Sequence, residues 1–353
     1  MRYKTFQDLQ LSALGMGCMR LPLKGGNSEI DEEQTARMAA YAMAHGINYF
    51  DTAWGYHGGN SESVMGKILS AYPRDAYHLA SKFPGYDLAN MPKVQEIFAR
   101  QLERCQSEYF DFYLFHNVCE LNIDAYLNEE YGILDHLLKQ KEAGRIRHLG
   151  FSAHGSIPVM ERFLNAYGEH MEFCQIQLNY LDWSLQDAKG KVELLNARHI
   201  PIWVMEPLRG GKLCTLDEEA MSELQKLRPQ ESMSGWAFRF LQSIPGVTMI
   251  LSGMSDMQQL QENIETFADE QPLNEDEMKT LTGIGRRMST SVPCTACRYC
   301  IEHCPRSLDI PELIRLYNDM VYSDGSFSAR NAVNALPADK QPSACISGGQ
   351  GEV

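Results

Sequence analysis

Short apolar runs alternate with longer amphipathic stretches along most of this chain. Between the apolar runs, hydrophobic residues recur at helical spacing, as in residues 31–46 and 128–144, which both end in the glycine expected just past a helix C-terminus. Residues 91–106 have the same spacing. Each apolar run has the length of one strand, and there are eight of them: residues 11–17, 47–51, 77–82, 110–116, 146–152, 172–177, 200–206 and 247–253.

This repeated order of strand and helix predicts the fold. Fully apolar strands are typical of parallel strands buried on both faces, and eight strand–helix units predict a (β/α)8 TIM barrel of the α/β class. The alternative is a doubly wound open sheet, which would carry a glycine-rich dinucleotide fingerprint after its first strand, and residues 15–20 (GMGCMR) lack one. Residues 1–10 predict a hairpin across the barrel floor, and residues 256–270 and 274–288 predict closing helices.

The sequence changes character after the last of these helices. Residues 289–353 hold five of the ten cysteines and a loose polar stretch, so we expect a barrel domain over residues 1–288 and a small second segment over 289–353. We find no internal repeat of fixed period beyond the barrel units.

Composition and charge limit the possible partners. With 44% hydrophobic and 22% charged residues, no apolar stretch long enough to cross a bilayer and no signal-peptide core in residues 1–15, we expect a cytoplasmic protein with no membrane role. The formal net charge of -14 disfavours nucleic acid, because phosphate backbones are bound by clusters of lysine and arginine.

Polar side chains close six of the apolar runs. Catalytic groups of such barrels lie where the loops after the strands converge, so we expect one mouth to be lined by Asp51, Lys82, His116, Ser152, Gln175 and Glu206. A single carboxylate at a strand end is more often a helix cap or a turn residue. The combination is harder to explain in this way, since three consecutive strands end in an acid, an amine and an imidazole, and Tyr56 lies in the loop after the first.

These four residue types suit protonation of an alkoxide. A tyrosine with a pKa of about 10 is a poor acid or base at neutral pH, and we expect the Lys82 ammonium to bring that pKa toward the working range. Asp51 would keep Lys82 charged on a buried rim. A neutral His116 would donate a hydrogen bond to a carbonyl oxygen.

Three segments carry a resemblance to a known family. Residues 50–62 (FDTAWGYHGGNSE), 80–83 (ASKF) and 111–116 (DFYLFH) resemble the aldo-keto reductase superfamily in order and separation, and the likeness extends over residues 1–285. The resemblance implies a (β/α)8 barrel that reduces an aldehyde or ketone by hydride transfer from NAD(P)H. It also implies a catalytic set made of Asp51, Tyr56, Lys82 and His116, with Tyr56 as the proton donor.

The same resemblance implies contacts to the nicotinamide cofactor. They are Gly17, Met19, Asp51, Ser152, Gln175, Pro207, Leu208, Gly210, Gly211, Gly253, Ser255, Gln259, Glu262 and Asn263. Two positions depart from the family pattern, because Ala153 stands where asparagine is common and Met205 where an aromatic residue often stacks on the nicotinamide. No basic residue lies in 252–263 to bind a 2'-phosphate, so NADP is preferred only through the family and NAD stays open.

Four cysteines form a CxxCxxCxxxCP run, Cys294, Cys297, Cys300 and Cys304. This spacing is that of bacterial ferredoxins and predicts one 4Fe-4S cluster, with zinc as the main competitor. The segment resembles the ferredoxin-like extension of some bacterial aldo-keto reductases. A second run is incomplete, because Gly348 and Gly351 follow Cys345 where cysteines are required. We therefore expect one cluster held by Cys294, Cys297 and Cys300, with Cys304, Cys345 or an external group as its fourth ligand. The alternative is a labile or three-iron centre.

Several functions stay open at this level. The cluster is either structural or an electron carrier for a redox protein partner, since hydride transfer to a carbonyl needs no cluster. The barrel is either an enzyme acting on a small carbonyl compound or a nicotinamide-binding regulatory protein without significant turnover. Aromatic residues after the strands suggest an apolar or aromatic substrate, and they are Trp54, His57, Phe83, Tyr86 and Trp183.

Overall fold

The computed structural model describes residues 1–25, 29–289, 292, 294, 299–302, 304–322 and 326–346. Its centre is a closed barrel of parallel strands in the order β10-β3-β4-β5-β6-β7-β8-β9. The strands are β3 (Leu14–Gly17), β4 (Tyr49–Asp51), β5 (His78–Phe83), β6 (Phe110–Val118), β7 (Ile146–Ala153), β8 (Cys174–Gln177), β9 (Ile202–Met205) and β10 (Val247–Gly253). Each strand falls within or overlaps one of the eight apolar runs, so the predicted (β/α)8 barrel is confirmed.

The barrel interior is closed at its floor by the N-terminal hairpin. Strands β1 (Tyr3–Phe6) and β2 (Leu9–Ser12) pair antiparallel, as the first residues predicted. Phe6 meets Trp203 edge to face, with ring centroids 5.0 Å apart, and belongs to a buried cluster inside the barrel that includes Tyr49, Phe112 and Phe173. Inward and outward positions alternate along each strand, so Trp203 faces inward while Ile202 and Val204 join the outer core.

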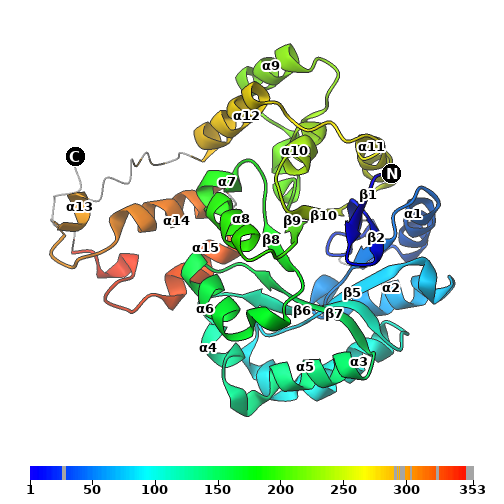
Figure 1. The fold of residues 1–353 in the computed structure, drawn as a ribbon. Coiled ribbons are helices and arrows are strands. Elements are labelled where there is room, and N and C mark those ends of the chain that lie inside the picture. Colours follow the sequence, from blue (N-terminus) through cyan, green and yellow to red (C-terminus); the bar gives the residue numbers. More distant parts are fainter. Residues whose placement is uncertain are drawn as a thin grey trace.

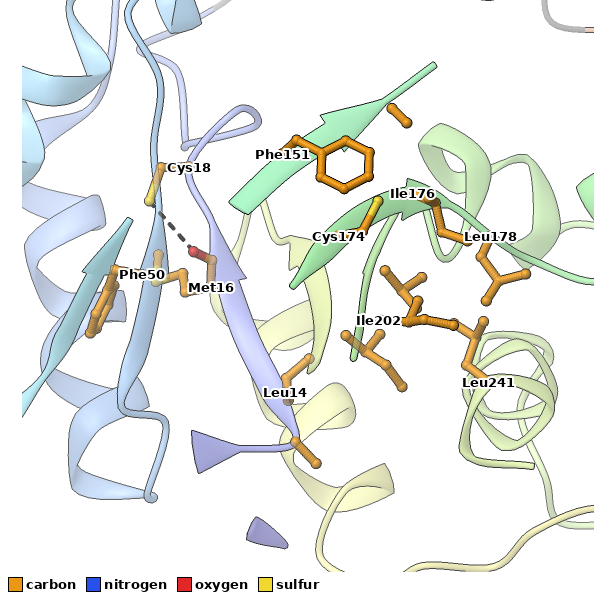
Figure 2. Close-up of a cluster of buried hydrophobic side chains, with 14 of the residues drawn as sticks. Leu14, Met16, Cys18, Phe50, Phe151, Cys174, Ile176, Leu178, Ile202 and Leu241 are labelled. Atoms are coloured by element: carbon orange, nitrogen blue, oxygen red, sulfur yellow. Dashed lines mark hydrogen bonds between the residues drawn. The ribbon is translucent and has the colours of Figure 1, made fainter. Parts of the chain in front are cut away.

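A second core lies between the strands and the surrounding helices (Figure 1). Figure 2 shows part of it, where Leu14 and Met16 of β3, Ile176 of β8 and Ile202 of β9 belong to one cluster. The helices are α1 (Glu32–Ala44), α2 (Ser61–Leu69), α3 (Val94–Arg104), α4 (Ile123–Tyr126), α5 (Ile133–Glu142), α6 (Ile157–Tyr167), α7 (Asp182–Leu185), α8 (Ala188–Ala197), α9 (Glu218–Leu227), α10 (Met233–Gln242), α11 (Met257–Thr266) and α12 (Glu275–Met288).

Two helices begin later than their periodicity predicted. Before α3, residues Leu88–Lys93 form a 3-10 helix that contains Pro92, whose missing N–H and ring interrupt an α-helix. Before α5, Gly132 takes a left-handed conformation with φ of 57°. This residue separates a 3-10 turn at Glu129–Tyr131 from α5, which therefore begins at Ile133.

The C-terminal segment forms α13 (Tyr299–Glu302), α14 (Ile310–Tyr322) and α15 (Phe327–Ala335). Helix α12 ends at Met288, next to the predicted domain boundary. Nevertheless α14 packs against α7 of the barrel, so the extension, drawn in orange to red in Figure 1, is docked on the barrel rather than tethered beside it. Within the described part of the chain, no helix has the length and apolar character that a bilayer crossing requires.

Candidate active site

Asp51 and Lys82 form a buried ion pair at the C-terminal rim of the barrel. Strands β4 and β5 are neighbours, and Asp51 pairs with Ala80. Lys82, two residues further along β5, lies on the same face of the strand as Ala80, so its side chain reaches Asp51. Lys82 Nζ donates to Asp51 Oδ1 at 2.6 Å and to the carbonyl of Thr52 at 2.9 Å, and the Lys82 side chain is fully buried. Burial favours the neutral amine, but Asp51 and Tyr56 together outweigh it and raise the pKa of Lys82, so an ammonium ion persists at neutral pH.

Tyr56 stands beside this pair, in the 3-10 turn Tyr56–Gly59 that follows β4. His57, next in the chain, has φ of 52° and accepts a hydrogen bond from the Leu21 N–H at 3.0 Å, which fixes the turn. The Tyr56 ring centroid lies 5.2 Å from Lys82 Nζ. Burial raises the pKa of Tyr56 to about 12, while the charge of Lys82 opposes this rise. The sequence led to the expectation of a lowered pKa, but desolvation of the half-buried phenol outweighs the charge of Lys82.

His116 completes the group from β6. Its ring lies nearly perpendicular to that of Tyr56, with centroids 6.1 Å apart, and nearly perpendicular to that of Tyr86, with centroids 5.2 Å apart. Burial, with the nearby charge of Lys82, holds the pKa of His116 well below its usual range. This lowered pKa favours the neutral imidazole at neutral pH, and its buried Nδ1 has no hydrogen-bond partner among the described residues.

Of the aromatic residues expected around a substrate, Tyr86 is the one that contacts His116. Phe83 is fully buried and packs on Tyr126 in the outer core. The guanidinium carbon of Arg104 lies 3.9 Å from the ring centroid of Trp54. These contacts show packing roles for Phe83 and Trp54.

Ser152 and Gln175 lie side by side on the neighbouring strands β7 and β8. The Ser152 hydroxyl accepts a hydrogen bond from the Asn117 N–H at 2.8 Å. Gln175 Nε2 approaches Met205 Sδ at 3.7 Å, while its buried Oε1 has no hydrogen-bond partner among the described residues. An unsatisfied buried amide oxygen indicates a missing polar group, such as another amide.

The loop after β9 is strained and partly open. Glu206, Arg209, Gly210 and Gly211 all have positive φ, at 54°, 47°, 66° and 90°. The two glycines are exposed and leave their backbone accessible, whereas Pro207 is buried and Leu208 half-buried. The sequence analysis named Pro207, Leu208, Gly210 and Gly211 as cofactor contacts and passed over Arg209, which is buried.

The remaining candidate contacts surround the ends of β3 and β10. Gly17 pairs with both Asp51 and Gly253 in the barrel, and Met19 is 55% exposed. After β10, three candidates are exposed: Ser255, Gln259 and Glu262. Asn263 is buried and donates to the Ser252 hydroxyl at 3.2 Å, which gives its side chain a partner inside the protein.

Arg20 is a second residue that sequence reasoning missed. Its aliphatic stem packs against Gly253 and its guanidinium lies over Gly210, at 3.1 Å and 3.0 Å from the positions where a Cβ would stand. The side chain is about half exposed, at 48%, and its Nη2 lies 3.5 Å from Glu206 Oε1, a long distance for an ion pair. A cation thus lies between the two segments proposed to contact a dinucleotide.

The cysteine run falls partly outside the described residues, because Cys297 is among those not described. Cys294 is exposed, and Cys300 and Cys304 are half-buried, with the Leu308 N–H donating to Cys304 Sγ at 3.4 Å. Among the side chains that the structure describes, no group of three or more potential metal ligands gathers.

The geometry so far defines a class: an eight-stranded barrel whose rim holds a buried carboxylate–ammonium pair, a phenol and a neutral imidazole. Residues 13–286 match the model of the Aldo/keto reductase family. The chain therefore belongs to the aldo/keto reductase family of oxidoreductases.

Similar proteins agree with this assignment. Uncharacterized oxidoreductase YqkF of Bacillus subtilis (strain 168) is 26% identical over 309 residues, which cover 78% of this chain and 92% of that protein. The fold resembles an aldo-keto reductase from Bacillus halodurans, with a TM-score of 0.67, 22% identity, and coverage of 80% of this chain and 96% of that one. It also resembles an aldo-keto reductase from Klebsiella pneumoniae in complex with NADPH, with a TM-score of 0.63, 20% identity and coverage of 80% and 95%.

Proposed function

We propose that this protein reduces an aldehyde or ketone to an alcohol with NADPH and that Tyr56 donates the proton. The observation that carries the proposal is the fully buried Lys82–Asp51 pair at 2.6 Å, with the rings of Tyr56 and His116 beside it. A buried ammonium ion costs stability unless it is paired, and next to a phenol it stabilises the phenolate that proton donation leaves behind.

The residues have distinct roles in this proposal. The bound nicotinamide supplies the hydride that reduces the carbonyl carbon. Neutral His116 donates a hydrogen bond to the carbonyl oxygen and stabilises the charge that develops there. Tyr56, which is protonated at neutral pH because its pKa is about 12, then protonates the alkoxide. Lys82 stays charged through Asp51 and stabilises the resulting phenolate.

Observations at the rim support a nicotinamide dinucleotide as the cofactor. The unsatisfied Oε1 of Gln175, beside Ser152, suits the carboxamide of a nicotinamide. The exposed backbone of Gly210 and Gly211 suits the close approach of a pyrophosphate, and Arg20 supplies a cation next to it. We prefer NADPH over NADH on the example of the Klebsiella pneumoniae structure. The preference has no support from residues 252–263, which contain no basic side chain to bind a 2'-phosphate.

The extension is proposed to hold one 4Fe-4S cluster, with a structural role or as an electron carrier for a redox protein partner. Four thiolates at ferredoxin spacing are a suitable donor set, and an N–H donated to Cys304 Sγ is a contact that cluster ligands commonly receive. Lys340 donates to the Arg306 carbonyl at 2.8 Å, which brings the segment before Cys345 next to the end of the run. Cys304 and Cys345 therefore both remain candidates for the fourth ligand.

Replacing Tyr56 with phenylalanine tests the enzymatic proposal. The variant keeps the ring but loses the proton, so we expect kcat for simple aldehydes to fall by about 100-fold or more. NADPH affinity, measured by quenching of protein fluorescence, should stay unchanged because the phenol is not among the proposed dinucleotide contacts. A Tyr56→Phe protein that binds NADPH and reduces aldehydes as fast as the parent would refute the role of Tyr56. Binding without turnover in the parent protein would instead favour the regulatory alternative.

A further inference from the structure

The strained loop Glu206–Gly211 is joined to the C-terminal extension by one buried arginine. Arg209 is 6% exposed, and its guanidinium forms ion pairs with Asp182 of α7 and with Asp319 of α14. Both carboxylates are buried, at 0% and 1% exposure. A loop of the barrel rim is therefore held from two sides, once by the barrel and once by the extension.

Asp319 is itself held in place by further hydrogen bonds. Its second carboxylate oxygen accepts from Gln186 Nε2 at 2.9 Å and from the Ser326 hydroxyl at 2.7 Å. At the other end of the loop, Lys212 Nζ donates to the Tyr322 carbonyl at 2.6 Å. The extension thus contacts the loop at Arg209 and directly after Gly211.

The conformation of the loop needs such support. Glu206 and Arg209 are not glycines, yet both have left-handed φ values, which side chains adopt only where the surroundings hold them. The two exposed glycines follow Arg209 directly, so the position of their backbone depends on where the Arg209 side chain is anchored.

We propose that Asp319 is a positioning residue for the nicotinamide cofactor, because through Arg209 it fixes the backbone of Gly210 and Gly211 on which the pyrophosphate rests. This inference depends on the proposed function, in which that loop contacts the dinucleotide. The extension then contributes to the affinity of the barrel for its cofactor without touching it.

The same helix also reaches the cysteine segment. Asn318, adjacent to Asp319 in α14, accepts from the Val292 N–H and donates to the Val292 carbonyl, both at 2.8 Å. Val292 precedes Cys294 by two residues. One turn of α14 thus contacts the loop Glu206–Gly211 through Asp319 and Val292, before the cysteine run, through Asn318.

The test compares Asp319→Asn with Glu312→Gln in the full-length protein. Asparagine keeps the size of the side chain but removes the charge opposite Arg209. Glu312 is the control because it is a carboxylate on the same helix whose ion pair, among the described residues, is with Arg315 at 2.7 Å and not with Arg209. We expect the Kd for NADPH of Asp319→Asn to rise by roughly 5- to 150-fold, the usual range of such couplings, with kcat at saturating NADPH unchanged. Glu312→Gln should match the parent in both values.

A measurement on the unaltered protein covers the case in which Asp319→Asn does not fold. Linkage is reciprocal, so NADPH binding should slow amide hydrogen exchange in α14 but not in α9. An unchanged Kd in a folded Asp319→Asn protein, or no added protection in α14, would overturn the role of Asp319. A parent protein that fails to bind any nicotinamide nucleotide would instead overturn the proposed function.

Discussion

Replacing Asp51 with asparagine isolates the charge that keeps Lys82 protonated. The amide preserves the shape of the side chain and a hydrogen-bond acceptor 2.6 Å from Nζ, but it removes the negative charge. The fully buried Lys82 would then have only neutral acceptors among these two groups, the amide at position 51 and the Thr52 carbonyl. Removing one partner of a buried ion pair typically costs about 3–5 kcal/mol, and we expect a loss of this size in the free energy of unfolding.

The same change predicts a displaced pH profile. The pKa of Lys82 is raised by Asp51 against the effect of burial, so without that charge burial dominates and the pKa falls. The ammonium ion exists only below this pKa. With increasing pH, the activity of Asp51→Asn should therefore fall at a lower pH than the activity of the parent protein. The alkaline limb of the variant's pH profile should be shifted to lower pH.

The assays are urea unfolding and kcat against pH at saturating NADPH. Asp111→Asn is a matched control, because Asp111 is also a buried carboxylate that pairs with an arginine, Arg74, at 2.6 Å, but it lies near the start of β6, away from the rim. The control should lose stability and keep the pH profile of the parent. If Asp51→Asn kept the alkaline limb of the parent, or lost no more stability than a surface substitution, the assigned role of the buried pair would be wrong.

Three further outcomes follow from single groups. Arg20→Gln should weaken NADPH binding roughly tenfold or more in fluorescence titration, the effect of a lost charge-assisted hydrogen bond, whereas Arg37→Gln on exposed α1 should not. Hydrogen bonds from His148 and Lys141 outweigh burial and lower the pKa of Glu172 from 4.5 to about 2, so its stabilising contribution is complete above pH 4.5 and is lost as pH falls toward 2. Glu172→Gln should flatten that part of the acid-unfolding curve followed by circular dichroism. Anaerobically purified protein should contain iron and sulfide, and Cys300→Ser should lose them; zinc in their place would reject the cluster.

The barrel was predictable from the sequence because its signals are local. Each strand lies in a short run rich in apolar residues, and the N-terminal hairpin shows loose alternation, so both follow from periodicity. The proximity of Asp51, Lys82 and His116 was predictable for a related reason, since parallel strands end at one rim. The starts of α3 and α5 were missed because Pro92 and Gly132 lie inside patterns that otherwise continue as helices.

Contacts between distant residues left no such signal. Arg209 and Asp319 are separated by 110 positions, and nothing in the local sequence of either shows that they meet. Arg20 likewise reaches Gly210 and Gly253 only after the barrel has closed. The loop proposed to contact the cofactor could therefore be identified by its resemblance to a family, whereas its contacts with the extension could not.

Burial also decides in which direction the proposed catalyst works best. The sequence led to the expectation that Lys82 makes Tyr56 more acidic, but desolvation outweighs that charge and the pKa reaches about 12. At neutral pH nearly every molecule then carries the proton that an alkoxide requires, while the phenolate needed to take a proton from an alcohol is scarce. The Asp51–Lys82 pair reduces the cost of forming that phenolate without making it the resting form. If Tyr56 is the acid proposed above, we therefore expect carbonyl reduction to be faster than alcohol oxidation at neutral pH, and the rate of oxidation to rise as the pH is raised toward the pKa of Tyr56.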